Sequence, residues 1–298
     1  MLAPSSGHDG RHRATPFDSV VVAARKAGLP EEEVRRLPRR WHRYGAVVLL
    51  RPRLDWTPPQ DLLPEIGACF ARGLGATSVG VVRGAARGER REPDVQRIFG
   101  PSTVTMLRQD GIAYVLDPTH VLFSPGNLSE RIRMGRLDAR GEVVVDLFAG
   151  VGYFCLPLLV HGGAARVEAC DINALSLTWL RQGAAANGVE GRLRTHHGDC
   201  RQVAPTGVAD RVVLGHWGET VAFLPTAMDA VRAGTLATLH VHDIVATPAG
   251  GVDGPWVGAL RQAIDRTQAE IRSVQVRRVK AAGAGLDHLV CDLVVHKD

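Results

Sequence analysis

The strand and glycine loop at residues 143–152 constrain this chain more than any other segment. Three valines are followed by a carboxylate and then by small residues, in the sequence VVVDLFAGVG. A β-branched run of this kind predicts a buried strand, and the apolar spacing after it predicts a helix. Gly150 and Gly152 let the backbone turn sharply and let a ligand approach it closely. Together these features predict a buried parallel strand that meets a helix across a nucleotide-like ligand.

A second strand pattern strengthens the prediction of an adenosine-type cofactor. Residues 166–170 are largely apolar and lead to Asp171, about 20 residues after the glycine loop. In doubly wound folds, an acidic residue at this distance accepts hydrogen bonds from a ribose diol. A glycine loop alone would also fit an ordinary tight turn, so the prediction depends on both features in this order.

The overall composition indicates a globular chain. Its 298 residues are 45% hydrophobic and 22% charged, and the length allows two domains. No run approaches the roughly 18 apolar residues that a membrane span needs. The N-terminus has no apolar signal core, so we expect a cytoplasmic protein with no membrane partner.

The charge balance is basic but does not by itself predict an RNA partner. The net charge is +5 and the isoelectric point is about 9.2, values that are compatible with nucleic-acid binding. Nearly all of the positive charge comes from arginine, because lysine occurs only at Lys26, Lys280 and Lys297. An arginine excess with abundant Ala, Gly and Val is more typical of a GC-rich genome than of a binding face.

The five cysteines are scattered and include no Cys-x-x-Cys pair. This pattern supports neither a zinc site nor a disulfide framework, so we expect small buried thiols and no metal. Cys200 differs in position because it follows Asp199 at the end of a predicted strand.

The chain is expected to divide into three parts. Residues 1–15 are polar and predict a flexible N-terminus. Residues 16–137 predict an N-terminal α+β domain with a bridging segment, and residues 138–298 predict the cofactor-binding catalytic domain. Within the N-terminal domain, strands are expected at 45–51, 79–83, 104–107 and 112–116, and a helix at 62–74.

Strand and helix patterns alternate from residue 142 onward. Strands are expected at 143–148, 166–170, 193–197, 210–214 and 236–243, and helices at 153–161, 174–187, 220–233 and 255–271. Alternation of this kind predicts an α/β fold, a doubly wound, mostly parallel sheet with helices on both faces. The last two strands, at 273–279 and 287–295, predict a hairpin at one edge of the sheet.

Ligands of such sheets lie beyond the carboxyl ends of the central strands. Carboxylates follow the first three strands of this domain, and together they suit a ribose and an adenine amine. Asp199 also fits a turn residue, and Asp146 also fits a cap on the following turn. The candidate cofactor-binding residues at these strand ends are Asp146, Phe148, Gly150, Gly152, Asp171, Ile172, Asp199, Cys200 and Gly215.

Residues 146–154 (DLFAGVGYF) and the apolar run 156–161 resemble the tRNA wybutosine-synthesising aminocarboxypropyl transferase family. These are class I S-adenosylmethionine (SAM) enzymes related to the tRNA guanine-N1 methyltransferases. Further landmarks that look like those of the family are residues 37–41, 91–95, 111–114, 123–127, 209–215 and 239–242. The resemblance extends over residues 35–245.

The resemblance implies a fold, a co-substrate and a reaction. It implies a class I SAM-dependent domain in which SAM gives its 3-amino-3-carboxypropyl arm to a nucleophile and methylthioadenosine leaves. Methyl or arm transfer is decided by how SAM is oriented. The methyltransferase relatives have an arginine at the position of Gly126, so glycine here favours arm transfer.

The resemblance also implies where the amino-acid end of SAM is held. Ser124, Asn127 and Arg131 are the candidates, and a guanidinium at 131 suits a carboxylate bidentately. Asn127 and Arg131 are accordingly candidate catalytic residues. The alternative is that Glu130 and Arg131 form a surface pair at a helix start.

The chain departs from the family beside the acceptor. The family has an apolar-Pro-Ser stretch there, whereas residues 215–219 read GHWGE, and Asp171 stands where the family usually has Glu. These differences favour a small-molecule acceptor, such as a phenol in antibiotic biosynthesis. His216 is then the candidate general base or positioning group, and Trp217 the candidate stacking residue. His216 also fits an ordinary loop histidine.

Three other functions remain open from the sequence. The first is a cyclase that closes the arm of SAM on itself with no acceptor. The second is a tRNA-modifying enzyme that transfers the arm or a methyl group. The third is a binding module that holds SAM without turnover. The first predicts methylthioadenosine from SAM alone, and the second predicts salt-sensitive RNA binding.

Overall fold

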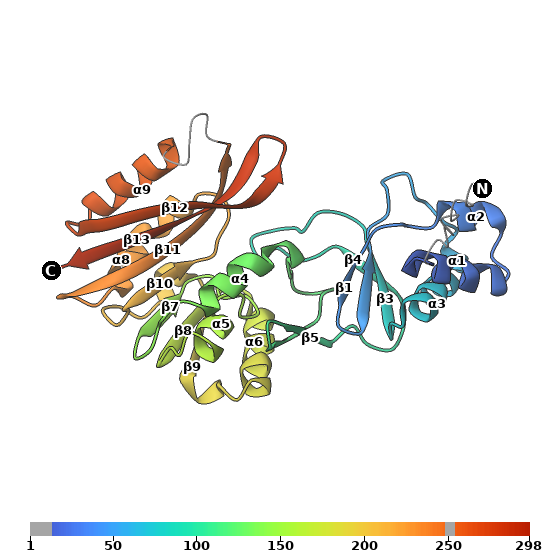
Figure 1. The fold of residues 1–298 in the computed structure, drawn as a ribbon, viewed down its shortest axis with the longest axis horizontal. Helices are drawn as coiled ribbons and strands as arrows, with labels where there is room; N and C mark the ends of the chain where they lie inside the picture. Colours follow the sequence, from blue (N-terminus) through green and yellow to red (C-terminus); the bar gives the residue numbers. More distant parts are fainter. Residues whose placement is uncertain (1–13, 248–253) are drawn as a thin grey trace, which may run out of the picture. The chain divides into compact units, whose positions relative to one another are not determined.

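The computed structural model describes residues 14–247 and 254–298 (Figure 1). By internal contacts the described chain divides into two compact units. Unit 1 runs up to Ala85 and includes Pro93–Thr105, and unit 2 comprises Ala86–Glu92 and Met106–Asp298. The segment that the sequence assigned to a bridge before residue 138 therefore falls inside unit 2. The predicted flexible N-terminus, residues 1–15, lies outside the described residues except for its last two.

Unit 1 is built on a four-stranded sheet in the order β1-β2-β3-β4. The inner strands β2 and β3 are parallel, and β1 and β4 pair antiparallel at the edges. Helices α1 and α3 pack closely, because a Cβ on Gly73 would lie 2.6 Å from the backbone nitrogen of Val20. The helices are α1 (Pro16–Lys26), α2 (Glu31–Arg36) and α3 (Leu63–Leu74), with a 3₁₀ turn η1 (Gln60–Leu62). The strands are β1 (Trp41–Tyr44), β2 (Val47–Leu50), β3 (Ser78–Val82) and β4 (Val95–Phe99).

Unit 2 contains a seven-stranded sheet in the order β12-β13-β11-β10-β7-β8-β9 (Figure 1). The strands from β11 to β9 in this order are parallel, and β13 pairs antiparallel with both β11 and β12. This arrangement confirms the predicted doubly wound, mostly parallel sheet. The strands are β7 (Val143–Asp146), β8 (Arg166–Asp171), β9 (Leu193–His197), β10 (Arg211–Leu214), β11 (Thr235–Ala246), β12 (Glu270–Gly283) and β13 (Leu286–Lys297).

The central strands β7 and β10 are mainly apolar because both of their faces are covered. Val145, Val212 and Leu239 belong to one core cluster, into which α8 and α9 insert Met228 and Leu260. The helices of this unit are α4 (Leu128–Gly135), α5 (Cys155–Val160), α6 (Ala174–Ala186), α7 (Cys200–Val203), α8 (Leu224–Ala230) and α9 (Pro255–Asp265). The 3₁₀ turns are η2 (Pro125–Asn127), η3 (Glu190–Arg192) and η4 (Thr220–Phe223), and β5 (Thr105–Gln109) pairs with β6 (Ile112–Leu116).

Two expected helices are shorter than the sequence suggested. The pattern at 220–233 forms the 3₁₀ turn η4 and then α8, which begins at Leu224 with a proline in its first turn. The pattern at 255–271 ends as a helix at Asp265, because Gln268 has a left-handed φ of 61° and β12 begins at Glu270. None of the helices in residues 14–247 and 254–298 is both long and apolar enough to span a membrane.

Candidate active site

The glycine loop after β7 has the backbone conformation that its glycines were expected to supply. Gly150 and Gly152 have positive φ values of 54° and 97°. A Cβ on Gly152 would lie 2.6 Å from Leu156 and 2.8 Å from Leu180. Glycine is therefore required at Gly152 both by the left-handed backbone and by the packing of α5 and α6 beneath the loop.

Asp171 fixes this loop from the end of β8. Its carboxylate accepts a hydrogen bond of 2.7 Å from the backbone N–H of Gly150 and another of 2.8 Å from that of Asn173. The side chain is half-buried, and burial raises its pKa although both hydrogen bonds lower it. Each carboxylate oxygen keeps a further lone pair, so Asp171 can orient the loop and still accept from a ligand.

Asp146 lies at the end of β7 and is fully buried. One carboxylate oxygen accepts from the backbone N–H of Phe148 at 3.2 Å, which is the capping contact that the sequence left open. The other oxygen has no hydrogen-bond partner among the described residues. Burial, and to a lesser extent the charge of Asp171, raise the pKa of Asp146 to about 7, although the hydrogen bond from Phe148 lowers it. The site therefore holds an unpartnered acid that titrates near neutral pH.

This raised pKa makes a stability prediction. Because the folded-state pKa of Asp146 lies above its unfolded value of 3.8, its contribution to stability is full below pH 3.8 and is lost as the pH rises through about 7. Asp146→Asn does not ionise. We expect the free energy of unfolding of the variant, minus that of the native chain, to grow by about 2–3 kcal/mol between pH 5 and pH 8.

Urea unfolding of both chains without SAM, at several pH values, measures this difference. Comparing the two chains at each pH removes the contribution of the histidines, which titrate in the same range. A difference that stays constant across this range would show that Asp146 ionises normally.

The third strand-end carboxylate has a local role. Asp199 accepts from the backbone N–H of Arg201 at 2.9 Å and caps α7, and the Arg201 side chain donates to both of its oxygens. The turn-residue interpretation of Asp199 thus fits the structure. Cys200 is buried, and burial followed by the charge of Asp199 raises the pKa of its thiol to about 11, which leaves little thiolate at neutral pH. Ile172 is 37% exposed and offers an apolar surface beside the loop.

The segment after β10 meets the glycine loop through aromatic contacts. The His216 ring stacks on Phe148, with centroids 4.6 Å apart, and Phe223 packs edge-on against both rings. Burial, followed by the charge of Arg91, lowers the pKa of His216, so its imidazole is neutral at pH 7. Gly215 is tightly packed, because a Cβ there would lie 2.9 Å from the Phe154 ring. His216 is thus held beside the predicted cofactor loop as a neutral base.

Arg131 is almost completely buried, with 2% of its surface exposed. It donates to the carbonyl of Ser124 at 2.9 Å and to Oε1 of Gln109 at 2.6 Å, and its guanidinium lies 4.7 Å from the centre of the Phe123 ring. Its Nε has no partner among the described residues. The expected alternative, a Glu130–Arg131 surface pair, is wrong because Glu130 is buried and pairs with Arg133 at 2.6 Å.

Asn127 completes this group at the start of α4. It is 6% exposed, makes no side-chain cap hydrogen bond, and leaves its Oδ1 without a partner in the described chain. The structure joins Arg131 to the carbonyl of Ser124 and places Asn127 in the segment between them, and their binding of a cofactor stays a prediction. It leaves a buried acceptor and a buried donor for a ligand that carries both an amino and a carboxylate group.

The structure adds residues that the sequence analysis missed. The Trp217 ring is contacted by Arg91, whose guanidinium lies 4.8 Å from its centre, by Lys280 at 5.8 Å and by the edge of His288. Lys280 and His288 face each other in the β12–β13 register. Only the insertion of β13 beside β11 brings this hairpin to the site, and local sequence patterns do not specify strand order.

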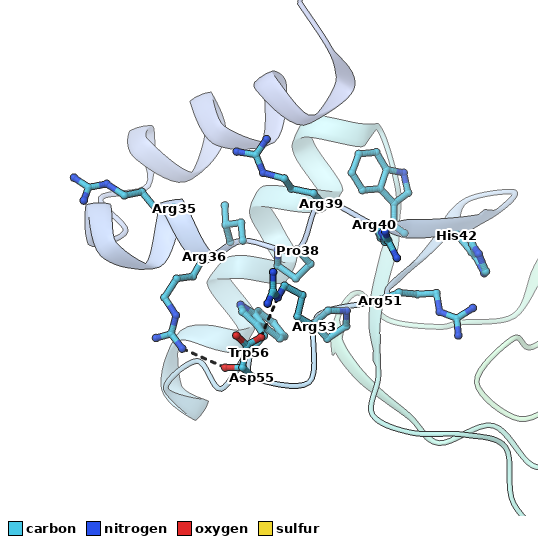
Figure 2. Close-up of a pocket in the computed structure, with 13 residues that line it drawn as sticks. Arg35, Arg36, Pro38, Arg39, Arg40, His42, Arg51, Arg53, Asp55 and Trp56 are labelled. Carbon is cyan, nitrogen blue, oxygen red and sulfur yellow. Dashed lines mark hydrogen bonds and ion pairs between the residues drawn. The ribbon is translucent and has the colours of Figure 1, made fainter. Parts of the chain in front are cut away.

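Unit 1 carries a separate basic pocket of about 1300 Å³ (Figure 2). Arginines from α2, from the segment after it and from the segment after β2 surround Trp56 and Trp41. Asp55 is the one acidic side chain that lines it, and it pairs with Arg53 at 3.3 Å. The arginines are Arg35, Arg36, Arg39, Arg40, Arg51 and Arg53. No carboxylate in residues 14–247 or 254–298 pairs with Arg40 or Arg51, so the pocket is open to an anion.

Two family models match most of the chain. Residues 105–249 match the TRM5/TYW2 methyltransferase domain, and residues 24–103 match the TYW2 N-terminal domain. The junction between the matches coincides with the division between the two units at Thr105. The similarity therefore extends to both units and not only to the glycine loop.

Curated proteins and solved structures agree with these matches. A tRNA(Phe) (4-demethylwyosine(37)-C(7)) aminocarboxypropyltransferase from Pyrococcus horikoshii is 33% identical over 90% of this chain and 94% of its own length. A tRNA wybutosine-synthesizing protein 2/3/4 from Oryza sativa is 34% identical over 92% of this chain, which spans 27% of that protein. The crystal structure of P. horikoshii TYW2 in complex with MeSAdo is similar with a TM-score of 0.78 and 30% identity, over 95% of this chain and 100% of that one.

Proposed function

This chain belongs to the TYW2 family of tRNA wybutosine-synthesising aminocarboxypropyltransferases, and on that basis we propose that its acceptor is a modified base of tRNA. The protein is an enzyme that transfers the 3-amino-3-carboxypropyl group, and SAM is its co-substrate. The observation that carries the proposal is the match over 94% of the P. horikoshii relative, whose acceptor is carbon 7 of 4-demethylwyosine in tRNA(Phe).

The small-molecule acceptor suggested by residues 215–219 has no support in these comparisons. They give no support to a role in antibiotic biosynthesis either, and they favour the tRNA alternative. His216 and Trp217 differ from the family in a single loop, whereas the similarity to the family covers both units. We therefore propose that residues 215–219 contact the tRNA base that accepts the arm.

The basic pocket of unit 1 supports an RNA partner. Arginine pairs bidentately with phosphate and stacks on bases. Trp56 offers an aromatic surface beside the guanidiniums (Figure 2), and Trp41 also lines the pocket. Burial and the charge of Arg51 lower the pKa of His42, so the arginines supply the positive charge of the pocket. The excess of arginine that was attributed to genome composition thus has a local use here.

The side chains of unit 2 fit SAM. Asp146, Asn127 and Arg131 each have a buried polar atom without a hydrogen-bond partner in the described chain. The hydroxyl, ammonium and carboxylate groups of SAM can supply the missing partners. We propose that Asp171 holds the ribose and that Ile172 contacts the adenine, while Asn127 and Arg131 hold the amino-acid arm. SAM supplies an electrophilic γ-carbon, whose bond to sulfur breaks as its bond to the acceptor carbon forms. His216, neutral and beside Phe148, is placed to take the proton that the acceptor carbon loses.

Incubation with SAM and tRNA(Phe) that carries 4-demethylwyosine tests the proposal. We expect methylthioadenosine and a tRNA that has gained the arm, both read by mass spectrometry. Methylthioadenosine from SAM alone at the same rate would instead establish a cyclase. S-adenosylhomocysteine as the product would show methyl transfer.

Salt dependence tests the RNA surface of unit 1. Each phosphate contact contributes about 0.7–0.9 to the slope of log K against log salt. We therefore expect Arg40→Ala with Arg51→Ala to lower the tRNA-binding slope by about 1–2 and to leave SAM binding unchanged. Arg140→Ala is the matched control, since Arg140 is exposed and already paired with Asp138 at 2.7 Å in unit 2. An unchanged slope in the double variant would remove the pocket from the RNA interface.

A further inference from the structure

The C-terminal hairpin places a cation beside the segment that starts α4. A Cβ built on Gly126 would lie 2.9 Å from Nζ of Lys280. The ammonium of Lys280 therefore lies against the backbone of Gly126, between Ser124 and Asn127 in the sequence. Lys280 is on β12, about 150 residues later in the chain than this segment.

Lys280 has no acidic partner in the described chain, although it is half-buried. Burial lowers the pKa of Lys280, and the positive charge of Arg131 lowers it again. Arg131 is itself almost fully buried and pairs only with neutral oxygens. Two cations thus lie near each other where desolvation is costly and where neither charge is compensated.

Two carboxylates of this unit have partners of their own: Glu130, next to Arg131 in the sequence, and Asp243, whose charge acts on His288, as that of Lys280 does. Glu130 pairs with Arg133. Asp243 accepts from the backbone N–H groups of Gly218, Thr220 and Ile244. Neither forms an ion pair with Lys280 in the described chain. The lysine is therefore open to a carboxylate of a ligand.

We propose that Lys280 holds the carboxylate of the amino-acid arm of SAM, together with the free Nε of Arg131. The Oδ1 of Asn127, buried and without a partner, accepts from the ammonium of the same arm. Both ends of the arm are then fixed, and the γ-carbon between them and the sulfur is turned toward the acceptor. Lys280 is thus a binding and orienting residue supplied by the hairpin, and this role rests on SAM as co-substrate and not on tRNA as acceptor.

Trp217 keeps the lysine in place. Its indole ring lies 5.8 Å from Nζ of Lys280, and Arg91 contacts the same ring. A cation over an indole face is attracted by the ring quadrupole and loses part of its freedom to move. The hairpin lysine therefore meets an incoming carboxylate in a restricted position, which lowers the entropy cost of binding.

Binding of three nucleosides to Lys280→Met tests the proposal without any acceptor. SAM carries the whole arm, decarboxylated SAM carries the arm without its carboxylate, and methylthioadenosine carries no arm. By calorimetry we expect SAM to bind about 10- to 100-fold more weakly, as for the loss of a charged hydrogen bond. The other two ligands should stay within about twofold of the native chain, because they lack the carboxylate.

Three companion variants sharpen the result. Lys280→Arg keeps the charge and should recover most of the SAM affinity. Gly126→Ala should weaken SAM alone, because its methyl group displaces only the flexible end of Lys280 and Gly126 has no positive φ. Arg272→Met removes an exposed cation of the same strand that already pairs with Glu270, and should change nothing.

Two outcomes would overturn the proposal. Equal weakening of all three ligands by Lys280→Met would mean that the lysine supports the fold of the pocket. Unchanged SAM affinity with weakened tRNA binding would assign Lys280 to a phosphate of the acceptor. The affinities for the three nucleosides are measured without any acceptor, so unchanged SAM affinity overturns the proposal whether or not tRNA is the acceptor.

Discussion

Replacing Asp171 with alanine is expected to abolish measurable SAM binding in a chain that remains folded. The carboxylate of Asp171 accepts from the N–H groups of both Gly150 and Asn173 and so holds the glycine loop against the end of β8. Its remaining lone pairs are the proposed acceptors for the ribose hydroxyls. The substitution removes both the loop anchor and the ribose acceptor, each worth about 1.5–3 kcal/mol for a charged hydrogen bond.

The affinity loss should therefore exceed about a hundredfold, because 1.4 kcal/mol corresponds to a factor of ten. Asp171→Asn should be nearly as severe, since its amide nitrogen would face a backbone donor. Calorimetric titration with SAM measures the loss, and circular dichroism verifies the fold. Asp199→Ala is the control. Its carboxylate is already bound by Arg201, so we expect a loss below about tenfold. Similar losses for both variants would show that Asp171 has no special part in the site.

Asp292→Ala is expected to destabilise unit 2 by about 1.5–3 kcal/mol, the usual worth of a hydrogen bond to a charged group. Asp292 lies on β13 and accepts from His240 on β11 at 2.6 Å, from Arg133 on α4 at 3.1 Å and from Arg277 on β12 at 3.0 Å. It thus joins the hairpin both to β11 and to the helix that carries Arg131. Without it, Arg133 keeps only Glu130.

The pH dependence gives a second test of the same group. Burial alone would raise the pKa of Asp292, but His240, Arg133 and Arg277 hold it below its ordinary value. Its stabilising contribution is therefore full above the unfolded value of 3.8 and is lost as the pH falls below it. Urea unfolding at pH 7 and below pH 3.8 should show a large difference between the two chains that shrinks in acid. Asp138→Ala, which breaks an exposed pair with Arg140, should not measurably change stability.

The sequence predicted the parallel part of the sheet well and the hairpin incompletely. Residues 143–171 carry their own signals, because β-branched runs, glycines and a terminal carboxylate are all local. The strands β1 and β4 were missed because Trp41–Tyr44 and Val95–Phe99 mix polar and apolar residues at the edges of a sheet and show no clear period. The hairpin itself was expected at one edge, where β12 does lie.

The site residues divide in the same way. Asp146, Gly150, Asp171 and His216 follow strands directly, so their neighbourhood was predictable from position. Lys280, His288 and Asp292 were not, because their partners depend on β13 lying between β11 and β12. The small-molecule acceptor expected from the sequence has no support in the comparisons, for a related reason. Residues 215–219 differ from the family pattern, but the sequence of this loop alone does not identify the acceptor. The similarity of both units to tRNA-modifying relatives was needed for that interpretation.

The contact between Asp171 and Gly150 has a kinetic consequence. The loop proposed to hold SAM is already fixed by a side chain of the same unit. Encounter with SAM then requires no slow search among loop conformers, and the observed rate should rise in proportion to concentration without reaching a plateau. Variants of this pocket that differ in SAM affinity should therefore differ mainly in the dissociation rate constant.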